Sequence, residues 1–479
     1  MSVGRDTSYN LAAALAPVLF ALLVTPFYLH LIGPDRFGVI AICWTLVGAL
    51  GFASLGMGPA VMYRLATASE ATPRSRSNLV WMGLVVSLAA SLLGALLVVA
   101  IAHVYFQHAA AISLALREEM RSATPYVALL LPIGALTGVL NGALQGRGRF
   151  GVLSAIGIVS AALGSTVPLA TALLVDVRLP SLVLAMLGAN TLIILIQAAA
   201  CTSIVPLRSP RWSADSAKAL LNYGAWMSGT ALISPLLLLF DRFLLGVFRG
   251  PAAVAVYALA YNVLQGLLYV PASLSSAMLP RLAPLDRQED VDELQSSWLL
   301  WLDAILTASV IAAIALSPAF FRLWIGPALG SAASPVAIIL LVGCWLHGIG
   351  HIASTVAVGR NRPDLLTKLL LACLVPYLVL LYFATAHYGV SGAAAAWTIR
   401  AAFDPILFRF TNPRLKDLRS VSFSGLLVIS AMIAGLSLSW TEPLYWAVMA
   451  LLLASACYRH RSILIATLSK AWTSVLEAR

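Results

Sequence analysis

The fold of this 479-residue chain is indicated by runs such as WMGLVVSLAASLLGALLVVAIAHVY, residues 81–105, which contains no Asp, Glu, Lys or Arg. A helix that crosses the hydrocarbon core of a bilayer needs about 20 mostly apolar residues. A membrane-spanning β-strand instead alternates apolar and polar residues over about ten positions. The run at 81–105 is too long and too continuously apolar for such a strand, so it predicts a membrane-spanning helix.

The composition of the whole chain agrees with this run. Apolar residues make up 61% of the sequence, charged residues only 10%, and the mean hydropathy is +0.92. An ordinary soluble domain carries about 25% charged residues. These values exclude a soluble enzyme, a nucleic-acid-binding domain and a disordered scaffold. The five cysteines lie in apolar runs without metal-ligand spacing, so we interpret them as small buried hydrophobic residues.

We predict an all-α membrane protein with about 14 transmembrane helices. Several boundaries are marked by turn-forming pairs, among them Gly33-Pro34 and Gly250-Pro251. The longest segment on the predicted outer side, about 106–124, is expected to form a surface helix. The predicted spans are 9–32, 37–63, 80–106, 125–145, 151–175, 180–206, 222–248, 252–280, 298–320, 332–358, 365–387, 390–410, 421–438 and 443–460.

Basic residues are distributed unevenly between the two sides of this arrangement. With the N-terminus in the cytoplasm, 22 of the 30 Lys and Arg residues fall on the inner side and six on the outer side. Such asymmetry is the positive-inside rule of membrane proteins. The net charge of +11 therefore reflects topology, with both termini cytoplasmic and an even number of spans, and it does not require a nucleic-acid partner. Two arginines, Arg242 and Arg400, remain inside spans.

An internal similarity relates the two halves of the chain. Residues 33–66 align with 250–283 without gaps, with nine identities that include both Gly-Pro pairs. The short segment 146–149 matches 359–362 at nearly the same offset. Chance similarity between apolar helices is the alternative, although the matches include the turns that end helices.

The similarity predicts two parallel six-helix repeats, 1–215 and 216–418, followed by two additional helices and a cytoplasmic tail, 419–479. An even number of helices per repeat preserves orientation, so an axis along the membrane normal relates the halves. Two such lobes with a cleft between them are typical of an alternating-access transporter.

The motifs of ATP hydrolysis and of membrane-bound glycosyl transfer are missing from the sequence. A P-loop requires Lys after Gly, and none of the four lysines follows a glycine. The outer segments are short and hold few acidic residues, whereas a glycosyltransferase would need catalytic carboxylates at a membrane face. These features favour transport over catalysis, driven by a gradient of an ion such as H⁺ or Na⁺ and without a cofactor.

Charged residues at membrane depth are the first candidates for a binding site, because each costs at least about 2.5 kcal/mol on insertion scales. Asp241 and Arg242 are adjacent and point about 100° apart on a helix, so at least one needs another partner. That partner is a second helix, water or a substrate. Arg400 and Asp404 share one helix face at i,i+4 spacing. They either neutralise each other or leave the Arg400 guanidinium to bind a diphosphate or carboxylate.

Neutral polar residues in the spans are further candidates. His347 and His351 lie one helical turn apart, but no third ligand accompanies them, so a metal site is disfavoured. They are either a pH-sensitive or cavity-lining pair, or packed neutral histidines. Asn262 and Gln265, together with Asn141, either line a cavity or bond a neighbouring helix.

Three segments carry a resemblance to a known family. TPFYLHLIGPDRFG at 25–38, LQGRGRF at 144–150, and DRFLLG at 241–246 followed by VYALA at 256–260 are similar, in order and spacing, to the corresponding segments of Wzx-type polysaccharide flippases. These belong to the multidrug/oligosaccharidyl-lipid/polysaccharide (MOP) superfamily. The related lipid II flippases carry arginines in the first helix, and this sequence has none at 9–32.

The resemblance implies a flippase of the bacterial inner membrane that moves an undecaprenyl-diphosphate-linked glycan from the inner to the outer leaflet. The cationic cavity of the family would map onto Arg242 and Arg400. Glycosyltransferases and a polysaccharide polymerase would be its pathway partners. Two alternatives stay open: an ion-coupled exporter of small cationic or amphipathic compounds, and an enzyme of lipid-linked glycan assembly.

Overall fold

The computed structural model describes residues 3–67, 73–202, 233–282, 285, 287–360, 362–412 and 418–461. Within these ranges every regular element is a helix, which confirms the predicted all-α class. Nine of the described helices are long and apolar enough to cross a membrane, and two shorter apolar helices follow at Val421–Ser437 and Pro443–Arg459. The described helices are those of a multi-pass membrane protein, and the count of 14 spans stays a prediction.

The chain divides into two compact units, unit 1 at Met1–Ala255 and unit 2 at Val256–Arg479. The division falls inside helix α9 (Pro251–Leu282). The predicted boundary at 215 lies outside the described residues, so the three predicted domains stay predictions.

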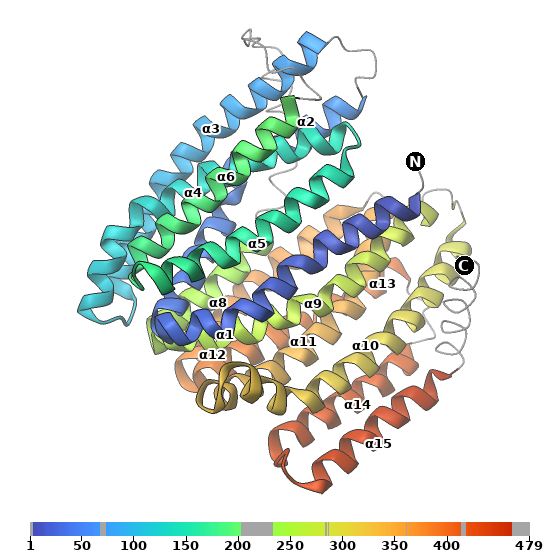
Figure 1. Ribbon diagram of the computed structural model, residues 1–479. Helices are drawn as coiled ribbons and strands as arrows, with labels where there is room; N and C mark the ends of the chain where they lie inside the picture. The colour runs from blue at the N-terminus through green and yellow to red at the C-terminus, as the bar shows by residue number, and fades with distance from the viewer. Residues whose placement is uncertain are drawn as a thin grey trace. The chain divides into compact units, whose positions relative to one another are not determined.

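Unit 1 is a bundle built around helix α4. This helix packs against α2, α3 and α6, while α1 packs against α5 and α8 (Figure 1). The elements of the unit are α1 (Val3–Ala49), η1 (Leu50–Ser54), α2 (Met57–Thr67), α3 (Pro73–Val104), the π-helical turn η2 (Tyr105–Ala109), α4 (Leu114–Gly146), α5 (Phe150–Leu174), α6 (Leu179–Thr202) and α8 (Ile233–Arg249).

Helix α3 shows why these apolar runs form helices that lie in lipid. Its Val80 and Val98 are fully buried in the bundle, whereas Leu93 and Leu96 are each 67% exposed. An exposed leucine face of this kind is unfavourable in water and favourable against acyl chains, and a helix bonds all its interior backbone groups within itself. The helix therefore presents one face to the unit and the other to the hydrocarbon core.

The surface helix expected at 106–124 is not a separate element. After the turn η2, helix α4 already begins at Leu114, and the Ser113 hydroxyl caps it by accepting a hydrogen bond from the Leu116 N–H at 3.3 Å. The charged residues Arg117, Glu118, Glu119 and Arg121 belong to the first turns of α4. The Glu119 carboxylate accepts two hydrogen bonds from the Arg36 guanidinium, at 2.6 and 3.0 Å, and a third from the Leu179 N–H. This forked ion pair joins α4 to α1 and to the start of α6.

The span predicted at 37–63 is interrupted. Helix α1 ends at Ala49, and α2 begins only at Met57, after η1 and a turn in which Leu55 and Gly56 have φ of 53° and 61°. A left-handed conformation at Leu55 is sterically costly for a side-chain-bearing residue. Hydropathy alone does not reveal such a break, because the whole stretch is apolar.

Helix α4 carries a column of glycines, Gly134, Gly138, Gly142 and Gly146, each four residues after the last. A Cβ atom at Gly142 would overlap the carbonyl oxygen of Gly58 on α2, and one at Gly146 would lie 2.7 Å from the carbonyl oxygen of Met62. Small residues at this spacing let two membrane helices approach backbone to backbone. We refer to these four residues as the glycine column; two of them, Gly142 and Gly146, explain how α2 lies so close to α4.

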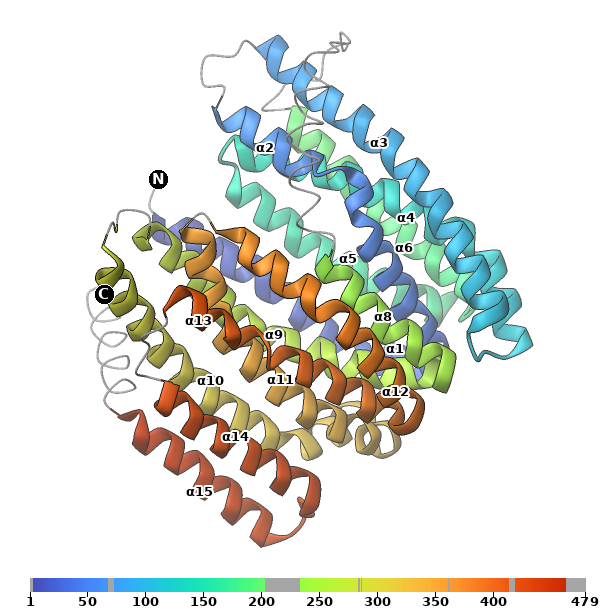
Figure 2. The same ribbon diagram turned by 180° about the vertical axis from the view of Figure 1, so that it is seen from behind.

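Unit 2 is built around helices α10 and α11, which pack along each other. Helix α12 covers α11, while α14 and α15 pack against α10 (Figure 2). The elements are the part of α9 from residue 256, α10 (Gln288–Ile325), α11 (Pro327–Gly359), α12 (Pro363–Ala401), η3 (Asp404–Leu407), α13 (Phe408–Thr411), α14 (Leu418–Ser437) and α15 (Pro443–Arg459).

The element α12 is two helices joined at Gly389, where φ is 59° and ψ is −132°. A Cβ atom on Gly392 would overlap the carbonyl oxygen of Ala384. Eight residues of straight helix span about 12 Å, so this contact requires the chain to reverse at Gly389. The reversal lies between the predicted spans 365–387 and 390–410.

A tyrosine attaches helix α15 to helix α10. Pro318 has no N–H, so the carbonyl of Ile314, four residues earlier, lacks its usual helical donor. The buried Tyr445 hydroxyl donates to the Ala315 carbonyl at 2.8 Å and lies 3.3 Å from the Ile314 carbonyl. The hydroxyl therefore bonds the backbone of α10 at the point where the proline removes one helical hydrogen bond.

We expect Tyr445→Phe to lower the free energy of unfolding by about 1–2 kcal/mol, because it removes the hydrogen bond that the buried hydroxyl donates to the backbone of α10. The thermal midpoint of the detergent-solubilised protein measures this. Tyr458→Phe is the matched control, since Tyr458 on the same helix is 69% exposed. Equal midpoints for the two variants would contradict the role of the Tyr445 hydroxyl.

Candidate functional site

The strongest cluster of charged side chains in the described residues lies at the end of α12 in unit 2. The helix ends at Ala401, and Asp404 begins the short 3₁₀ helix η3. One oxygen of the Asp404 carboxylate lies 3.5 Å from Nη1 of Arg400, and the other lies 2.6 Å from Nδ1 of His347 on α11. The two residues predicted to share a helix face thus form an ion pair, and a histidine joins them from a neighbouring helix.

Glycines on α11 allow this close approach. A Cβ atom on Gly350 would lie 2.5 Å from the Asp404 Cβ, and one on Gly343 would overlap the ring of Trp397. Since Gly350 lies between His347 and His351, the backbone of α11 can reach η3 where the histidines project. The local sequence therefore places imidazole and carboxylate together.

An aromatic wall adjoins the cluster. The guanidinium carbon of Arg400 lies 6.0 Å from the ring centre of Trp397, and Tyr261 meets that ring edge-on at 5.9 Å. The ring centres of His347 and His351 are 6.0 Å apart. Arg400 and Asp404 are only 9% and 8% exposed, whereas the His347 side chain is 36% exposed.

This arrangement gives one carboxylate two partners, a guanidinium and an imidazole. Arg400 carries a permanent charge, and the Asp404 carboxylate places one oxygen near that charge and the other near the imidazole of His347. A planar guanidinium with five N–H donors can hold a carboxylate and still offer donors to a phosphate oxygen. The cluster has the chemistry of an anion-binding group.

The other predicted pair lies in unit 1. Arg242 on α8 is 6% exposed, and its Nη1 donates to the Thr45 hydroxyl at 2.6 Å and to the Ala41 carbonyl at 3.1 Å. Asp241 beside it is fully buried. The expected partner from a second helix is thus found on α1.

The remaining predicted residues lie on α9, in unit 2. Asn262 and Gln265 are both exposed. No contact in the described residues brings Gln265 to the Arg400 cluster, and its binding role stays a prediction, as do those of the other candidate residues.

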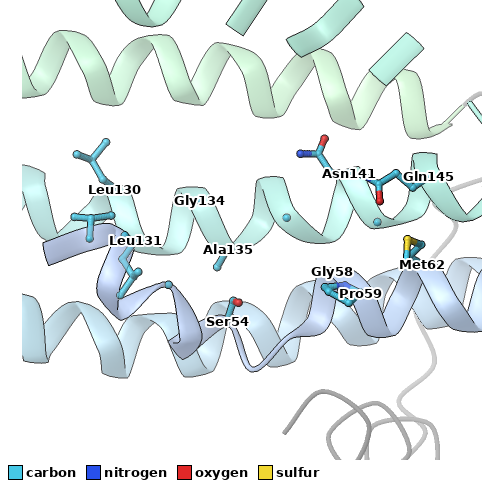
Figure 3. A pocket seen from close by; sticks show the side chains of 15 residues that line it. Ser54, Gly58, Pro59, Met62, Leu130, Leu131, Gly134, Ala135, Asn141 and Gln145 are labelled. Carbon is cyan, nitrogen blue, oxygen red and sulfur yellow. The ribbon is translucent and has the colours of Figure 1, made fainter. Parts of the chain in front are cut away.

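A cavity in unit 1 is lined in part by Asn141, and its location was not predicted from the sequence. It encloses about 500 Å³ between α4 and the broken segment formed by η1 and α2. Figure 3 shows Asn141 and Gln145 at one end of it and Leu130 and Leu131 at the other. The Asn141 side chain accepts a hydrogen bond from Gln197 on α6 at 2.9 Å. The glycine spacing along α4 is the signal that could have located this cavity.

A second polar network was also missed. Asp303 on α10 is fully buried. Ser424 on α14 donates to its carboxylate at 2.7 Å, Thr307 donates at 3.1 Å, and His460 lies 3.5 Å away. The network ties α10 to α14 and to the end of α15. Residues 303, 424 and 460 are too far apart in the sequence for any spacing rule to connect them.

The fold has known relatives among membrane transporters. The structure is similar to that of the lipid II flippase MurJ in its inward closed conformation, with a TM-score of 0.74 at 13% identity over 96% of this chain and 99% of that one. It is also similar to an inward-facing MATE-family multidrug resistance transporter of the MOP superfamily, with a TM-score of 0.66 at 17% identity over 88% and 97% of the two chains. The chain therefore shares its fold with these two transporters.

The comparison of sequences identifies the family to which the chain belongs. A family model described as "Polysaccharide biosynthesis protein" matches residues 30–328, and the chain belongs to this family. A protein of Shigella flexneri named "Putative O-antigen transporter" is 24% identical over 415 residues, which cover 87% of this chain and 99% of that protein. The resemblance to Wzx-type polysaccharide flippases is thereby confirmed.

Proposed function

We propose that the protein moves an undecaprenyl-diphosphate-linked oligosaccharide from the inner to the outer leaflet of a bacterial inner membrane, by alternating access, for surface polysaccharide synthesis. The observation that carries the proposal is the family match across residues 30–328. The similarity to an O-antigen transporter over nearly its whole length supports the same class of cargo. Both termini are proposed to be cytoplasmic, with glycosyltransferases and a polymerase as pathway partners.

In this mechanism Arg400 attracts the diphosphate. Desolvation strengthens a charge-assisted hydrogen bond between guanidinium and phosphate, and Asp404 and His347 hold the guanidinium in place. His351, Asn262 and Gln265 are proposed to contact the head group, and Asp241 and Arg242 to serve the same function in unit 1. The polyprenyl tail stays in lipid, and an H⁺ or Na⁺ gradient is proposed to drive the cycle.

Purified protein in liposomes tests the proposal directly. We expect a fluorescent undecaprenyl-diphosphate-linked glycan, present in both leaflets, to become fully accessible to an external quencher only when the protein is present. Protein-free liposomes should stop at the fraction in the outer leaflet. Failure of the glycan to cross would contradict the proposal.

The same liposomes separate the two alternatives. The MATE-like fold makes export of small cationic compounds the second candidate. Ion-dependent movement of a cationic dye, without glycan movement, would establish that candidate instead. Sugar transfer to a lipid acceptor by the purified protein would establish an enzyme of glycan assembly.

A further inference from the structure

A second cavity lies in unit 2, away from the Arg400 cluster. It encloses about 310 Å³ between the C-terminal end of α10, the start of α11, and the connection from α14 to α15. By the charge asymmetry of the sequence, these helix ends lie on the predicted outer side of the membrane. None of the residues proposed above to bind the head group lines this cavity.

The cavity is lined by hydrogen-bonding groups and a cation. These are Arg322 of α10, Ser331 and Ser334 of α11, and Ser439, Trp440 and Thr441 of the connection. The guanidinium carbon of Arg322 lies 5.5 Å from the ring centre of Trp440. Within the described residues no carboxylate lies within 4 Å of Arg322, so its charge is not neutralised by an ion pair.

Ser334 is the second independent sign of a ligand. Its residue is 5% exposed, yet its hydroxyl makes no hydrogen bond to any described residue, while the neighbouring Ser331 hydroxyl donates to the Ala328 carbonyl at 2.9 Å. A buried serine in a helix ordinarily donates to a carbonyl of the preceding turn. The Ser334 hydroxyl keeps some accessible surface and lines the same cavity as the Arg322 guanidinium, so it is available to donate to a ligand there.

The surroundings point to a lipid. Trp324 stacks on Phe320 with ring centres 5.4 Å apart, and Trp446 donates to the Trp440 carbonyl at 2.8 Å. Tryptophans gather at the level of the lipid head groups in membrane proteins. Leu436, which lines the cavity, is 45% exposed, and acyl chains would lie against it.

From this geometry we infer that the cavity binds the phosphate group of a membrane lipid, with Arg322 holding the phosphate through charge-assisted hydrogen bonds and Ser334 donating to one of its oxygens. Two lipids carry that chemistry, a bilayer phospholipid and a polyprenyl phosphate. The inference does not depend on the proposed flippase activity.

Native mass spectrometry of the full-length protein tests the inference with two lipids that differ only in the phosphate. We expect the wild type to retain phosphatidic acid and to release diacylglycerol with the same chains. Arg322→Gln should weaken phosphatidic acid binding about tenfold or more, and Ser334→Ala roughly threefold, as expected for a charged and a neutral hydrogen bond. Arg178→Gln is the matched control, because Arg178 is also on the predicted outer side and its side chain is 72% exposed.

Two results would overturn the inference: unchanged phosphatidic acid binding in folded Arg322→Gln, or equal retention of the two lipids by the wild type. Should Arg322→Gln fail to fold, the Ser334→Ala variant decides the question. Unchanged phosphatidic acid binding in that variant overturns the inference.

Competition between lipids identifies the source of the phosphate. Displacement by undecaprenyl phosphate at lower concentration than by phospholipid assigns a polyprenyl lipid, and the reverse assigns a phospholipid. Displacement by inorganic phosphate at equally low concentration overturns the lipid as occupant.

Discussion

Replacing Arg400 by glutamine is expected to lower surface polysaccharide to about a tenth of the wild-type level or less, because the proposed site loses its charge-assisted hydrogen bonds to the diphosphate. The protein should still fold, since the Asp404 carboxylate keeps its 2.6 Å contact with His347. Surface glycan, normalised to membrane-inserted protein, measures the effect in cells without the native gene. Arg400→Lys should retain part of the activity, because lysine keeps the charge but not the planar fork.

Arg409→Gln is the control for this variant, since Arg409 is exposed and lies nine residues further along the chain. The double variant Arg400→Gln/Asp404→Asn separates binding from neutralisation. If Arg400 only neutralised Asp404, removing both charges would restore transport. Wild-type glycan in either Arg400 variant that lacks the charge would refute the proposed binding role.

Gly142→Ala is expected to lower the free energy of unfolding by about 2 kcal/mol, as overpacking at a tight contact does. The added Cβ would overlap the Gly58 carbonyl oxygen, and this atom belongs to the backbone of α2 and cannot turn aside as a side chain does. In a helix interior alanine otherwise stabilises the helix by about 1 kcal/mol relative to glycine. A lower free energy of unfolding for Gly142→Ala therefore indicates the tight contact with α2. The thermal midpoint in detergent measures it.

Gly134→Ala provides the matched control. Gly134 lies two turns earlier on the same helix, and a Cβ atom there would have no neighbour within 4 Å. This variant should be neutral or more stable than the wild type. If both variants melted alike, the backbone contact between α2 and α4 would not be tight, and the account of the glycine column would be wrong.

Much of the helical architecture could be predicted from the apolar runs. The span predicted at 180–206 begins within one residue of α6 (Leu179–Thr202), and the span at 332–358 lies inside α11 (Pro327–Gly359). Hydropathy fails where a helix continues into polar sequence. The segment 106–124, expected to be a separate surface helix, is divided between η2 and the start of α4, where Glu119 is held by Arg36 from another helix. It fails also at Leu55 and Gly56, where the backbone turns within an apolar stretch.

The candidate site was predictable only where local periodicity applies. The spacing of Arg400 and Asp404 along one helix was sufficient to place them together, and their ion pair is formed. The contact between His347 and Asp404 joins residues 57 positions apart, through glycines whose role depends on the packed partner. The Arg242 contact with Thr45 has the same character, because it depends on how α1 and α8 pack. Such pairings are set by tertiary packing, and no spacing within one segment encodes them.

The glycine column has a mechanical consequence for unit 1. In most helix pairs, ridges of side chains on one helix pack into grooves on the other. Sliding one helix along the other is then opposed by steric clashes between these side chains. Along Gly58, Gly142 and Gly146 the two backbones touch with almost no side chains between them. Helix α2 is joined to α1 through a turn and a short 3₁₀ segment. Few side chains therefore interlock α2 with α4 along these glycines. A shift of α2 along its axis against α4 would change the volume of the 500 Å³ cavity beside it, while the other helices of the unit keep their packing.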